Sequence, residues 1–575
     1  MITLSIDGTS VSVPDGTSIL EAARQAGAKV PTLCYLKDIN EIASCRMCVV
    51  EVEGNESLVT SCNTPAQEGM KVSTNTKRVQ QARHDALELI LAHHATSCFD
   101  CKRNGNCALQ DVTYGLDVSD IKHAVSLEPR RQPQDFPLVR DDSKCINCMR
   151  CVSECSKVQN LGIWDRVHAG SKTYIGTPGF PDISDSACAL CGQCATHCPC
   201  GALTERDDTV IVTQMINDPS CITIAQVAPS IRSAWGEPLG LSSDEATVGR
   251  MVAAIRSLGF DYVFDTDFAA DMTIMEEGTE LLHHLETSPD QPMFTSCCPG
   301  WIRFLKAKHP NLVGNLSSTK SPQQIFGAIA KNYYADILGV DPSKIRVVSF
   351  MPCIAKKAEC AYPDMDTTGT GPDVDAVLTT RELGRMLANT RTQVRKLDEE
   401  EFDMPLGEAT GAAHIFGATG GVMEAALRSA YFLVTGTNPE PDAFSAVRGR
   451  EGWREVSFNL AGTELKLAVV SGLENADALC KALEDGSANY HFVEVMACPG
   501  GCVGGGGQPI HEGQERALDR ELILRDLDAN APLRFSHENP SVIECYEKYF
   551  GKPNSELAEK LLHSDHFAWG MPAAR

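Results

Sequence analysis

One cysteine pattern occurs twice in the middle of this chain, as CINCMRCVSEC at residues 145–155 and as CALCGQCATHCP at residues 188–199. In each copy, two residues separate the first three cysteines from one another, and three residues separate the third from the fourth. Thiolates at this spacing bind a cubane of four iron and four sulfur atoms. The repeat therefore predicts a compact unit that holds two 4Fe-4S clusters.

This unit resembles the bacterial two-cluster ferredoxins, in which the fourth cysteine of each run binds the other cluster. The resemblance implies one ligand set of Cys145, Cys148, Cys151 and Cys198, and another of Cys188, Cys191, Cys194 and Cys155. Crossed ligation holds the two clusters close together, which suits electron transfer. Ser156 in place of a proline and the long linker to Ala187 depart from the ferredoxin pattern without removing a ligand, and Cys200 is given no ligand role.

Length and composition frame the rest of the chain, which has 575 residues, 25 cysteines and a formal charge of −25. So long a chain should divide into several domains. The start, MITLSIDG, lacks the basic and apolar segments of a secretion signal, and no uncharged apolar run approaches the ~20 residues needed to cross a bilayer. Crowded cysteines then predict metal binding in a reducing compartment, hence a cytoplasmic protein. The acidic charge argues against nucleic acid and anionic membranes as partners.

Residues 1–78 are expected to form a first domain, with strand patterns in residues 2–13 and an amphipathic helix from Ser18 to about Gly27. Four cysteines with a tight pair in the middle suit a 2Fe-2S cluster: Cys34, Cys45, Cys48 and Cys62. Their order resembles plant-type ferredoxins, which implies a β-grasp fold, although the first gap is longer, as in complex hydrogenases and respiratory complex I. A zinc site is the alternative, disfavoured because paired zinc-ribbon cysteines are absent.

Residues 79–138 are expected to bind a further cluster. A helix with one apolar face, formed by Val79, Ala82, Ala86, Leu87 and Ile90, leads to His94. Three cysteines that lack a fourth follow: Cys98, Cys101 and Cys107. His94 is therefore predicted to complete a 4Fe-4S site, where a neutral imidazole makes the cluster less negative, and His93 is the weaker candidate. One histidine with three cysteines again resembles hydrogenases and the large subunit of complex I.

Beyond residues 139–209, which contain the ferredoxin-like repeat, residues 210–575 alternate apolar strands with amphipathic helices. Strands are predicted at residues 222–227 and 262–264, with a helix at 248–258 between them. The chain is thus predicted to be a multidomain α+β and α/β protein that ends in a large α/β domain with parallel sheets. Short apolar runs at residues 292–294, 345–350 and 492–497 each precede a cysteine-containing loop, and such loops converge beyond the carboxyl ends of parallel strands.

Those three loops read TSCCPGW at residues 295–301, MPCIAKK at residues 351–357 and ACPGGCVGGGGQP at residues 497–509. As a set they resemble the signature loops of the iron-iron (FeFe) hydrogenases. The resemblance implies that Cys298, Cys353, Cys498 and Cys502 hold a 4Fe-4S cubane. Cys502 would bridge it to a two-iron unit with carbon monoxide, cyanide and dithiolate ligands, which completes the H-cluster.

The same resemblance assigns further residues around the two irons. Lys356 would bind one cyanide, and Pro229 and Ser230 would contact the other. Met351 and Met496 would pack against the irons, although ordinary core packing explains a methionine almost as well. The glycines at positions 500, 501 and 504–507 would allow close backbone approach, with a flexible loop as the alternative.

Proton delivery is expected to use a separate set of side chains. By resemblance Cys297 is the final donor to the dithiolate amine, and a thiol with a pKa near ~8.5 suits acid-base work near neutral pH. Glu277 and Glu280 share a helix face and match two glutamates of the family's proton path, with Ser317 as a hydroxyl relay. The alternative is a pair of ordinary exposed helix carboxylates.

At the outer end of this path, where close relatives carry arginine, the chain has His284 beside His283. Histidine titrates near neutrality, whereas arginine stays charged. Proton entry is therefore hypothesised to depend on pH, and His284→Arg is expected to flatten the pH profile of turnover between roughly pH 6 and 8. An unchanged profile would contradict the hypothesis.

The resemblance spans essentially the whole chain and is strongest to clostridial-type hydrogenases with one 2Fe-2S and three 4Fe-4S accessory clusters. It implies reversible reduction of protons to H2 with electrons from ferredoxin or a similar carrier, and a need for maturation proteins. One alternative is the catalytic subunit of a complex that exchanges electrons with NAD(H) or NADP(H) through partner subunits. Another is a non-catalytic iron-sulfur electron-transfer or assembly protein, disfavoured because Cys297, Lys356 and Cys502 are all present.

Overall fold

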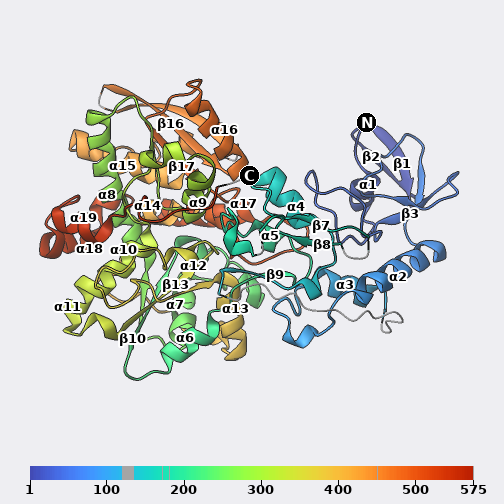
Figure 1. Cartoon of the computed structure of the whole chain (residues 1–575), viewed down its shortest axis with the longest axis horizontal. Helices are drawn as coiled ribbons and strands as arrows, with labels where there is room; N and C mark the ends of the chain where they lie inside the picture. Colours follow the sequence, from blue (N-terminus) through green and yellow to red (C-terminus); the bar gives the residue numbers. More distant parts are fainter. Residues whose placement is uncertain (119–134, 171–172, 181, 450, 461, 574–575) are drawn as a thin grey trace.

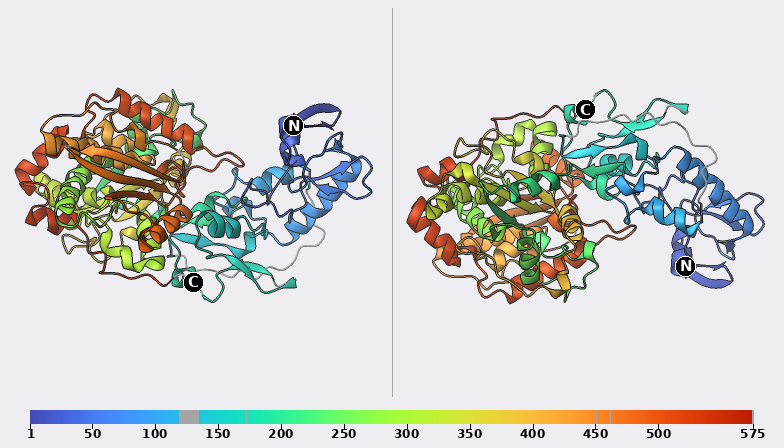
Figure 2. Two further views of the ribbon diagram at one scale, coloured as in Figure 1. Left: turned by 90° about the horizontal axis from the view of Figure 1, so that it is seen from above. Right: turned by 90° about the horizontal axis from the view of Figure 1, so that it is seen from below.

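The computed structural model describes residues 1–118, 135–170, 173–180, 182–449, 451–460 and 462–573. Residues 119–134 of the expected second domain lie outside this description. All 25 cysteines lie within it, and none of them forms a disulfide. Figures 1 and 2 show an elongated molecule with the N-terminal sheet at one end, the large C-terminal part at the other and the cysteine-rich segments between them.

The N-terminal part is a five-stranded sheet with the strand order β2-β1-β5-β3-β4. Its strands are β1 (Ile2–Ile6), β2 (Thr9–Val13), β3 (Val49–Val52), β4 (Val59–Thr60) and β5 (Lys71–Ser73). Helix α1 (Ile19–Gln25) begins where predicted, because the Ser18 side chain accepts a hydrogen bond from the Glu21 amide and so caps the first turn. Its buried residues join the apolar side chains of the sheet in one core.

Helix α2 (Lys77–Ala92) leads from this sheet to α3 (Ala108–Gly115). Its buried face differs from the apolar face predicted by periodicity, because Arg83 and Leu91 are buried with Val79 and Leu87, whereas Ala82 is only half-buried. The buried Arg83 guanidinium donates a hydrogen bond of 2.8 Å to the Val49 carbonyl. This hydrogen bond to the first sheet places Arg83 on the buried face of α2. Hydrophobic periodicity does not predict such a polar contact.

The cysteine repeat forms two matching halves, each with a short helix: α4 (Arg150–Ser153) and α5 (Gln193–Thr196). Strands β6 (Leu138–Arg140) and β9 (Leu203–Glu205) pair antiparallel, as do β7 (Asp165–Val167) and β8 (Tyr174–Gly176). A single core holds Cys151, Cys155, Cys188 and Cys194 together with Trp164.

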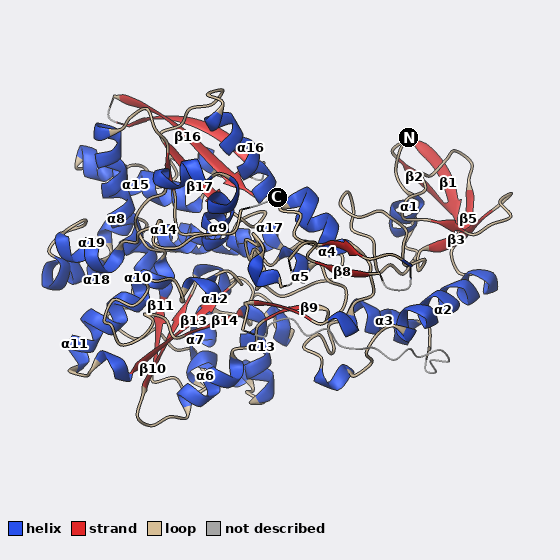
Figure 3. Ribbon diagram, viewed as in Figure 1, coloured by secondary structure: helices blue, strands red, loops and turns tan. Residues whose placement is uncertain are grey.

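The C-terminal part contains two four-stranded sheets, seen on either side of a layer of helices in Figure 3. The first has the order β11-β10-β13-β14 and is parallel throughout, as predicted: β10 (Ile222–Val227), β11 (Tyr262–Asp265), β13 (Ile345–Met351) and β14 (Ala376–Thr379). The second has the order β12-β17-β16-β15: β12 (Met293–Phe294), β15 (Trp453–Leu460), β16 (Thr463–Ser471) and β17 (Phe492–Met496). Here the prediction of parallel strands is wrong for β15, because β15 and β16 form an antiparallel hairpin.

Long helices fill the space between the sheets. Helix α8 (Thr266–Thr287) starts directly after β11 and packs on α10 (Pro322–Ile329) and α15 (Gly421–Thr435). The other helices of eight or more residues in this part are α6 (Thr209–Ile216), α7 (Val248–Arg256), α9 (Pro299–Lys308), α13 (Thr380–Asn389), α16 (Leu473–Glu484) and α17 (Ala517–Asn530). Within the described ranges, no helix combines the length and apolar character needed to span a bilayer.

Candidate functional site: a cysteine-lined cavity

The three cysteine loops leave the carboxyl ends of three strands and meet at one place. Cys298 follows β12 and caps α9, whose first residue is a proline, a residue that suits this position because no N–H donor is needed there. Cys353 follows β13, and Cys498 and Cys502 follow β17. Because β12 and β17 belong to one sheet and β13 to the other, the site lies between two sheets.

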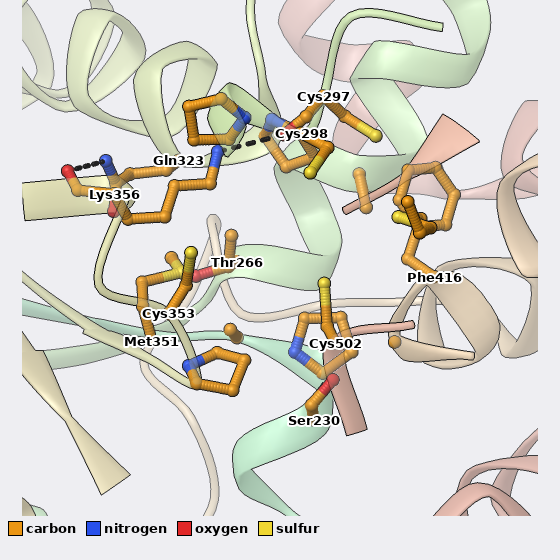
Figure 4. A pocket seen from close by; sticks show the side chains of 18 residues that line it. Ser230, Thr266, Cys297, Cys298, Gln323, Met351, Cys353, Lys356, Phe416 and Cys502 are labelled. Carbon is orange, nitrogen blue, oxygen red and sulfur yellow. Dashed lines mark hydrogen bonds between the residues drawn. The ribbon is translucent and has the colours of Figure 1, made fainter. Parts of the chain in front are cut away.

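A cavity of about 80 Å³ lies between these loops (Figure 4). Nine of the predicted residues line it: Pro229, Ser230, Cys297, Cys298, Met351, Cys353, Lys356, Met496 and Cys502. The sulfurs of Cys298 and Cys502 point into the same space from opposite sides, whereas the Cys297 sulfur points to a different side from that of Cys298. Cys498 faces the ferredoxin-like unit, with its Sγ 3.7 Å from the Cys191 carbonyl oxygen.

The four loop cysteines repel one another as thiolates. Burial, together with the charge of Cys298, raises the pKa of Cys353 to about 11. Burial also raises the pKa of Cys502 far above its ordinary value, and Cys298, Cys353 and Cys498 add to this effect. Four enclosed thiolates therefore require a cationic centre among them, which the iron of a cubane supplies. The donor set fits the expected cluster.

Lys356 brings a buried cation to the cavity wall. Its Nζ donates a hydrogen bond of 3.1 Å to the Cys297 carbonyl (Figure 4). The same Nζ pairs with Glu359 at 3.0 Å. Both carboxylate oxygens of Glu359 lie within 3.1 Å of Nζ, so an anionic ligand in the cavity would share the ammonium donors with Glu359. Burial opposes the charge, but Glu359 outweighs it and raises the pKa of Lys356, which keeps the lysine cationic.

Unsatisfied polar atoms test whether small polar ligands fit this cavity. Ser230 Oγ and Gln323 Oε1 are buried and have no hydrogen-bond partner among the described residues. A hydroxyl in such a place needs an acceptor, and a bound cyanide provides one. A Cβ atom at Gly417 would lie 2.2 Å from Ser230 Oγ, so only glycine leaves that hydroxyl free. The residues present therefore fit a compact unit with diatomic ligands.

The glycine run approaches protein backbone rather than the cavity alone. A Cβ atom at Gly505 would lie 2.2 Å from the Pro352 carbonyl oxygen, and one at Gly506 would lie 2.3 Å from the Cys191 carbonyl oxygen. At Gly507 it would lie 2.8 Å from the Cys353 amide nitrogen. The run is thus packed tightly between two other cysteine loops, which argues against the flexible-loop alternative.

Glu277 and Glu280 lie on α8 behind Cys297. Ser317 Oγ donates a hydrogen bond of 2.5 Å to Glu280, whereas both carboxyl oxygens of Glu277 are buried without a hydrogen-bond partner in the described chain. Burial, with the nearby charge of Glu280, raises the pKa of Glu277 to about 8. Glu277 is therefore a buried carboxyl that holds its proton near neutral pH, and not an exposed helix carboxylate.

Cys297 differs from the expectation of an ordinary thiol. Burial raises the pKa of the Cys297 thiol well above its usual value, and the Glu277 carboxylate raises it further. The ordinary thiol pKa near ~8.5 does not hold at this site, because burial disfavours the charged thiolate. The thiol keeps its proton until a strong acceptor stands beside it.

His284 lies at the surface end of α8, half-exposed, next to the exposed His283. Its Nε2–H donates a hydrogen bond of 2.8 Å to the Gln291 carbonyl. The ring is therefore held in place one helical turn beyond Glu280.

The accessory cysteines also gather as sets. Cys145, Cys148, Cys151 and Cys198 line one small cavity, together with Cys200. In the second set, charge on Cys188 and Cys155 acts on Cys194, and charge on Cys194 and Cys155 acts on Cys191. These neighbours are the crossed sets implied by the ferredoxin resemblance.

His94 lines a third cavity with Cys98, Cys101 and Cys107, whereas His93 is exposed. Its Nδ1–H donates a hydrogen bond of 3.0 Å to the Lys144 carbonyl, which leaves Nε2 free as a ligand. Burial lowers the pKa of His94 and so favours the neutral ring that ligation requires.

In the N-terminal part, Cys48 Sγ and Cys62 Sγ lie 3.3 Å apart, and Cys34 is hydrogen-bonded to Cys45. The buried Asn40 amide donates to the carbonyls of Cys34 at 2.7 Å and Cys148 at 3.0 Å. The first cysteine set is thus joined directly to the ferredoxin-like unit.

Sequence reasoning missed several residues at the site. Thr266, Ala270, Gln323, Phe416 and Gly417 line the cavity but belong to segments without a cysteine motif. His563, near the C-terminus, contacts the Ser318 hydroxyl, which donates a hydrogen bond to Glu280. An isolated histidine gives no sequence signal for such a contact.

Family comparisons agree with this architecture. A model described as iron only hydrogenase large subunit, C-terminal domain, matches residues 221–506, and one described as iron hydrogenase small subunit matches residues 514–569. Upstream, the matching models are 2Fe-2S iron-sulfur cluster binding domain at residues 1–77, NADH-ubiquinone oxidoreductase-G iron-sulfur binding region at 83–122 and 4Fe-4S dicluster domain at 144–202. The first of these favours 2Fe-2S over the zinc alternative.

Full-length relatives are similar as well. The NADP-reducing hydrogenase subunit HndD of Solidesulfovibrio fructosivorans is 46% identical, with 99% of each chain covered. Iron hydrogenase 1 of Clostridium pasteurianum is 39% identical, with 98% of this chain and 99% of that protein covered. The apo [FeFe]-hydrogenase HydA1 from Chlamydomonas reinhardtii superimposes with a TM-score of 0.57 at 38% identity, covering 64% of this chain and all of the other. The family prediction is confirmed: this chain belongs to the FeFe-hydrogenases and carries 2Fe-2S and 4Fe-4S domains ahead of the hydrogenase domain.

Proposed function

We propose that this protein catalyses the reversible reduction of protons to H2 at an H-cluster held by Cys298, Cys353, Cys498 and Cys502. The observation that carries the proposal is the enclosed cavity in which Cys502, Cys297 and Lys356 meet beside the unpartnered Ser230 hydroxyl. When bound, the two-iron unit supplies the metal chemistry that joins protons and electrons. The chain holds the unit, excludes water and delivers protons.

The polar side chains of the cavity have separate tasks in this proposal. Lys356 and Ser230 would donate hydrogen bonds to the two cyanide ligands, with Pro229, Met351 and Met496 as apolar walls. Cys297 holds a proton at its sulfur on the cavity side. Glu280 and Glu277 on α8, with Ser317 from the loop before α10 hydrogen-bonded to Glu280, would return a proton to Cys297 from the helix surface.

For the electron side, we propose one 2Fe-2S cluster in residues 1–78, a 4Fe-4S cluster with His94 in residues 79–138 and two 4Fe-4S clusters in residues 139–209. The catalytic domain would occupy residues 210–575. Lys144 supports a short path, because its carbonyl accepts hydrogen bonds of 3.0 Å from both His94 and Cys200. Cys191 and Cys498 adjoin where the path would enter the catalytic site.

Two electron partners are candidates. A ferredoxin-type carrier is one, and partner subunits that exchange electrons with NADP(H) are the other. The second is favoured by the 46% identity over 99% of the chain to a subunit named as NADP-reducing. Copurification from the native cell tests this: partner subunits with NADP-dependent H2 turnover support the complex, whereas full activity with ferredoxin alone supports the first candidate.

The decisive experiment is the infrared spectrum after production with the hydrogenase maturation machinery. Carbon monoxide and cyanide stretches that disappear in Cys502→Ala, together with H2 evolution from a reduced viologen, are the expected result. Absence of these bands from a protein with all accessory clusters loaded would overturn the proposal in favour of a non-catalytic iron-sulfur protein. Cys545→Ala is a control, because this buried thiol lies on α18 (Pro540–Cys545), outside the cysteine loops.

A further inference from the structure

Glu280 is linked to a second polar path besides the one that follows α8 to His284. Its carboxylate accepts hydrogen bonds from the Ser318 amide at 2.9 Å and the Ser318 hydroxyl at 3.0 Å. The same hydroxyl lies 2.8 Å from Nδ1 of His563. Three polar groups, from α8, the loop before α10 and the C-terminal segment, therefore form one continuous hydrogen-bonded chain.

The surroundings of His563 fix its protonation pattern. Its Nε2 lies 3.1 Å from Oε2 of Glu276, which also accepts a hydrogen bond from the Asn554 backbone amide at 2.8 Å. The other oxygen of Glu276 accepts a hydrogen bond from the Tyr546 hydroxyl at 2.5 Å. A carboxylate so placed keeps the proton of the neutral ring on Nε2. In the neutral ring, Nδ1 can therefore accept the one hydrogen of the Ser318 hydroxyl. In the imidazolium, Nδ1–H donates to Ser318 Oγ instead, and the hydroxyl is free to donate to Glu280.

A surface carboxylate lies near the outer end of the path, beyond direct hydrogen-bond distance of His563. On α19 (Glu556–Leu562), Glu559 has a half-exposed side chain whose carboxylate oxygen lies 3.8 Å from Nδ1 of His563. The His563 ring itself is buried. A buried histidine thus lies between a solvent-facing carboxylate and the hydroxyl that touches Glu280, which is the geometry of a relay and not that of an isolated core residue.

We propose that His563, acting through the Ser318 hydroxyl, is a second proton relay to Glu280, so that protons enter this hydrogenase by two branches that join at Glu280. The inference rests on the proposed function and adds to it a residue of the segment that matches the small-subunit model. The branch through His284 is the first entrance, and the branch through Glu559 and His563 is the second.

The transfer balances without any other reactant. A proton from Glu559 or surface water passes to Nδ1 of His563, and the ring becomes an imidazolium with Nε2–H still bonded to Glu276. Nδ1–H then passes its proton to Ser318 Oγ while the hydroxyl proton moves to the Glu280 carboxylate. His563 returns to neutral, Ser318 is unchanged and Glu280 has gained one proton.

A matched pair of variants tests the relay. Ser318 and Thr319 both donate a hydroxyl hydrogen bond to Glu280, at 3.0 Å and 3.2 Å, but the 2.8 Å contact to His563 Nδ1 is made by Ser318. Ser318→Ala and Thr319→Val therefore each remove one donor to Glu280, and the first also cuts the path. His563→Gln retains an amide that can bond Glu276 and Ser318 but cannot carry a proton.

Rates of parallel routes add, so each branch alone should sustain part of the turnover. We expect Ser318→Ala and His563→Gln to lower viologen-driven H2 evolution by about threefold, and Thr319→Val by less than about 1.5-fold. In the double variant Ser318→Ala/His284→Ala both entrances are cut, and turnover should fall by about 100-fold. This fall is well beyond the product of the losses caused by Ser318→Ala and by His284→Ala when each is measured alone. Equal effects of Ser318→Ala and Thr319→Val, or a double variant equal to that product, would overturn the relay.

Two further readouts separate a proton relay from a structural clamp. The carbon monoxide and cyanide bands should be unchanged in all of these variants, because none of the substitutions lies in the H-cluster pocket. In protein with labelled histidine nitrogens and without the two-iron unit, the His563 resonance should shift in Ser318→Ala and stay in place in Thr319→Val. No shift in either variant would contradict the hydrogen bond. If the parent protein lacked the bands and H2 turnover, the proposed function would fail instead.

Discussion

Glu277 is the residue whose environment most directly sets a pH dependence. It faces Glu280 on its own helix, Ser296 and Ser317 on the neighbouring loops, Glu494 on β17 and the Cys297 thiol, and its pKa is raised to about 8 by burial first and Glu280 second. The carboxyl therefore holds a proton below about pH 8 and loses it above. Because this pKa is raised, its contribution to folding stability is complete below the ordinary carboxyl pKa and is lost as pH rises through 8.

The Glu277→Gln variant should therefore lose turnover by about 10²–10⁴-fold, the usual value of a positioned acid-base group. The remaining activity should lack the decline near pH 8 that we expect of the parent enzyme. Steady-state H2 evolution measured from pH 6 to 9 checks both points. Equal activity of variant and parent would remove Glu277 from the proton path.

Glu494 supplies the control for this substitution. It is also buried, and its carboxylate accepts hydrogen bonds from the amides of Gly420 at 2.6 Å and Met423 at 2.7 Å. Glu494→Gln makes the same chemical change at a structural carboxylate. It should lower the unfolding temperature while leaving turnover within a few-fold of the parent. If Glu494→Gln lowered turnover as much as Glu277→Gln, the loss in Glu277→Gln would reflect the removal of a buried carboxyl in general and not a specific role of Glu277 in proton transfer.

Among single residues, the sequence predicted those site residues that belong to motifs and did not predict those that lie outside them. Lys356 and Cys502 lie in cysteine loops, and the cavity contains both. Phe416 and His563 come from segments whose local pattern is ordinary, and only the folded chain brings them to the site. The pKa of Cys297 was also beyond sequence reasoning, because it depends on enclosure by segments far apart in the chain.

Among the elements, the glycine run between Cys502 and Gln508 shows how tightly the loops are packed. Gly506 has room for no side chain, since a Cβ atom would lie 2.3 Å from the Cys191 carbonyl oxygen and 2.6 Å from Gly192 Cα. Gly506→Ala should therefore push the catalytic loop away from the ferredoxin-like unit. We expect a loss of about 1–3 kcal/mol in stability, as for other overpacked sites, and weaker electron transfer into the catalytic domain.

Thermal unfolding followed by cluster absorbance, together with viologen-driven H2 evolution, measures both effects of Gly506→Ala. Gly115→Ala is the control, because the exposed Gly115 ends α3 with no heavy atom within 4 Å of the added Cβ. The control should be neutral or slightly stabilising. A Gly506→Ala protein that melts like the control and keeps full activity would show that the two loops can separate freely.

Most single elements could be predicted, whereas their assembly could not. The strand at residues 222–227 is β10 to the residue, and the helix predicted from residue 248 is α7. Local periodicity is enough for both, because each buries one continuous apolar pattern. The division of eight strands between two sheets, and the antiparallel β15, depend on pairings between distant segments that periodicity does not encode.

For the whole molecule, a buried charge cluster joins the ferredoxin-like unit to the catalytic part. Arg381 on α13 pairs with Glu205 of β9 at 2.7 Å and donates to the carbonyls of Gly506 at 2.8 Å and Gln508 at 2.7 Å. Arg385 adds a second bond to Glu205 at 2.9 Å. Burial raises the pKa of Glu205, but the two arginines outweigh burial and hold the pKa well below its usual value.

Arg381→Gln should therefore destabilise the molecule by about 3 kcal/mol at neutral pH, because a buried carboxylate loses its main partner. A lowered carboxylate pKa contributes stability that is present above the unfolded pKa and is lost as pH falls. The difference in melting temperature between variant and parent should accordingly shrink on acidification below about pH 4.5. Arg395→Gln, which breaks the exposed pair with Glu245, should leave the melting temperature close to that of the parent. Equal costs for the two variants would contradict a structural role for the buried cluster.

Electron flow along the molecule can be separated from chemistry at its end. Cys194 belongs to the cysteine set next to Cys498, whereas the equally buried Cys200 lies 4.0 Å from Cys198 without an assigned ligand role. Cys194→Ser should lose the iron of one cubane and lower viologen-driven H2 evolution on the order of tenfold or more, because the path to the catalytic site is interrupted. Isotope exchange between H2 and D2O consumes no net electrons, so it should persist. The Cys200→Ser protein should keep the full iron content of the parent, together with viologen-driven H2 evolution and isotope exchange. If exchange and evolution fell together in Cys194→Ser, the substitution would have damaged the catalytic domain itself, and a linear relay of clusters would not explain the loss.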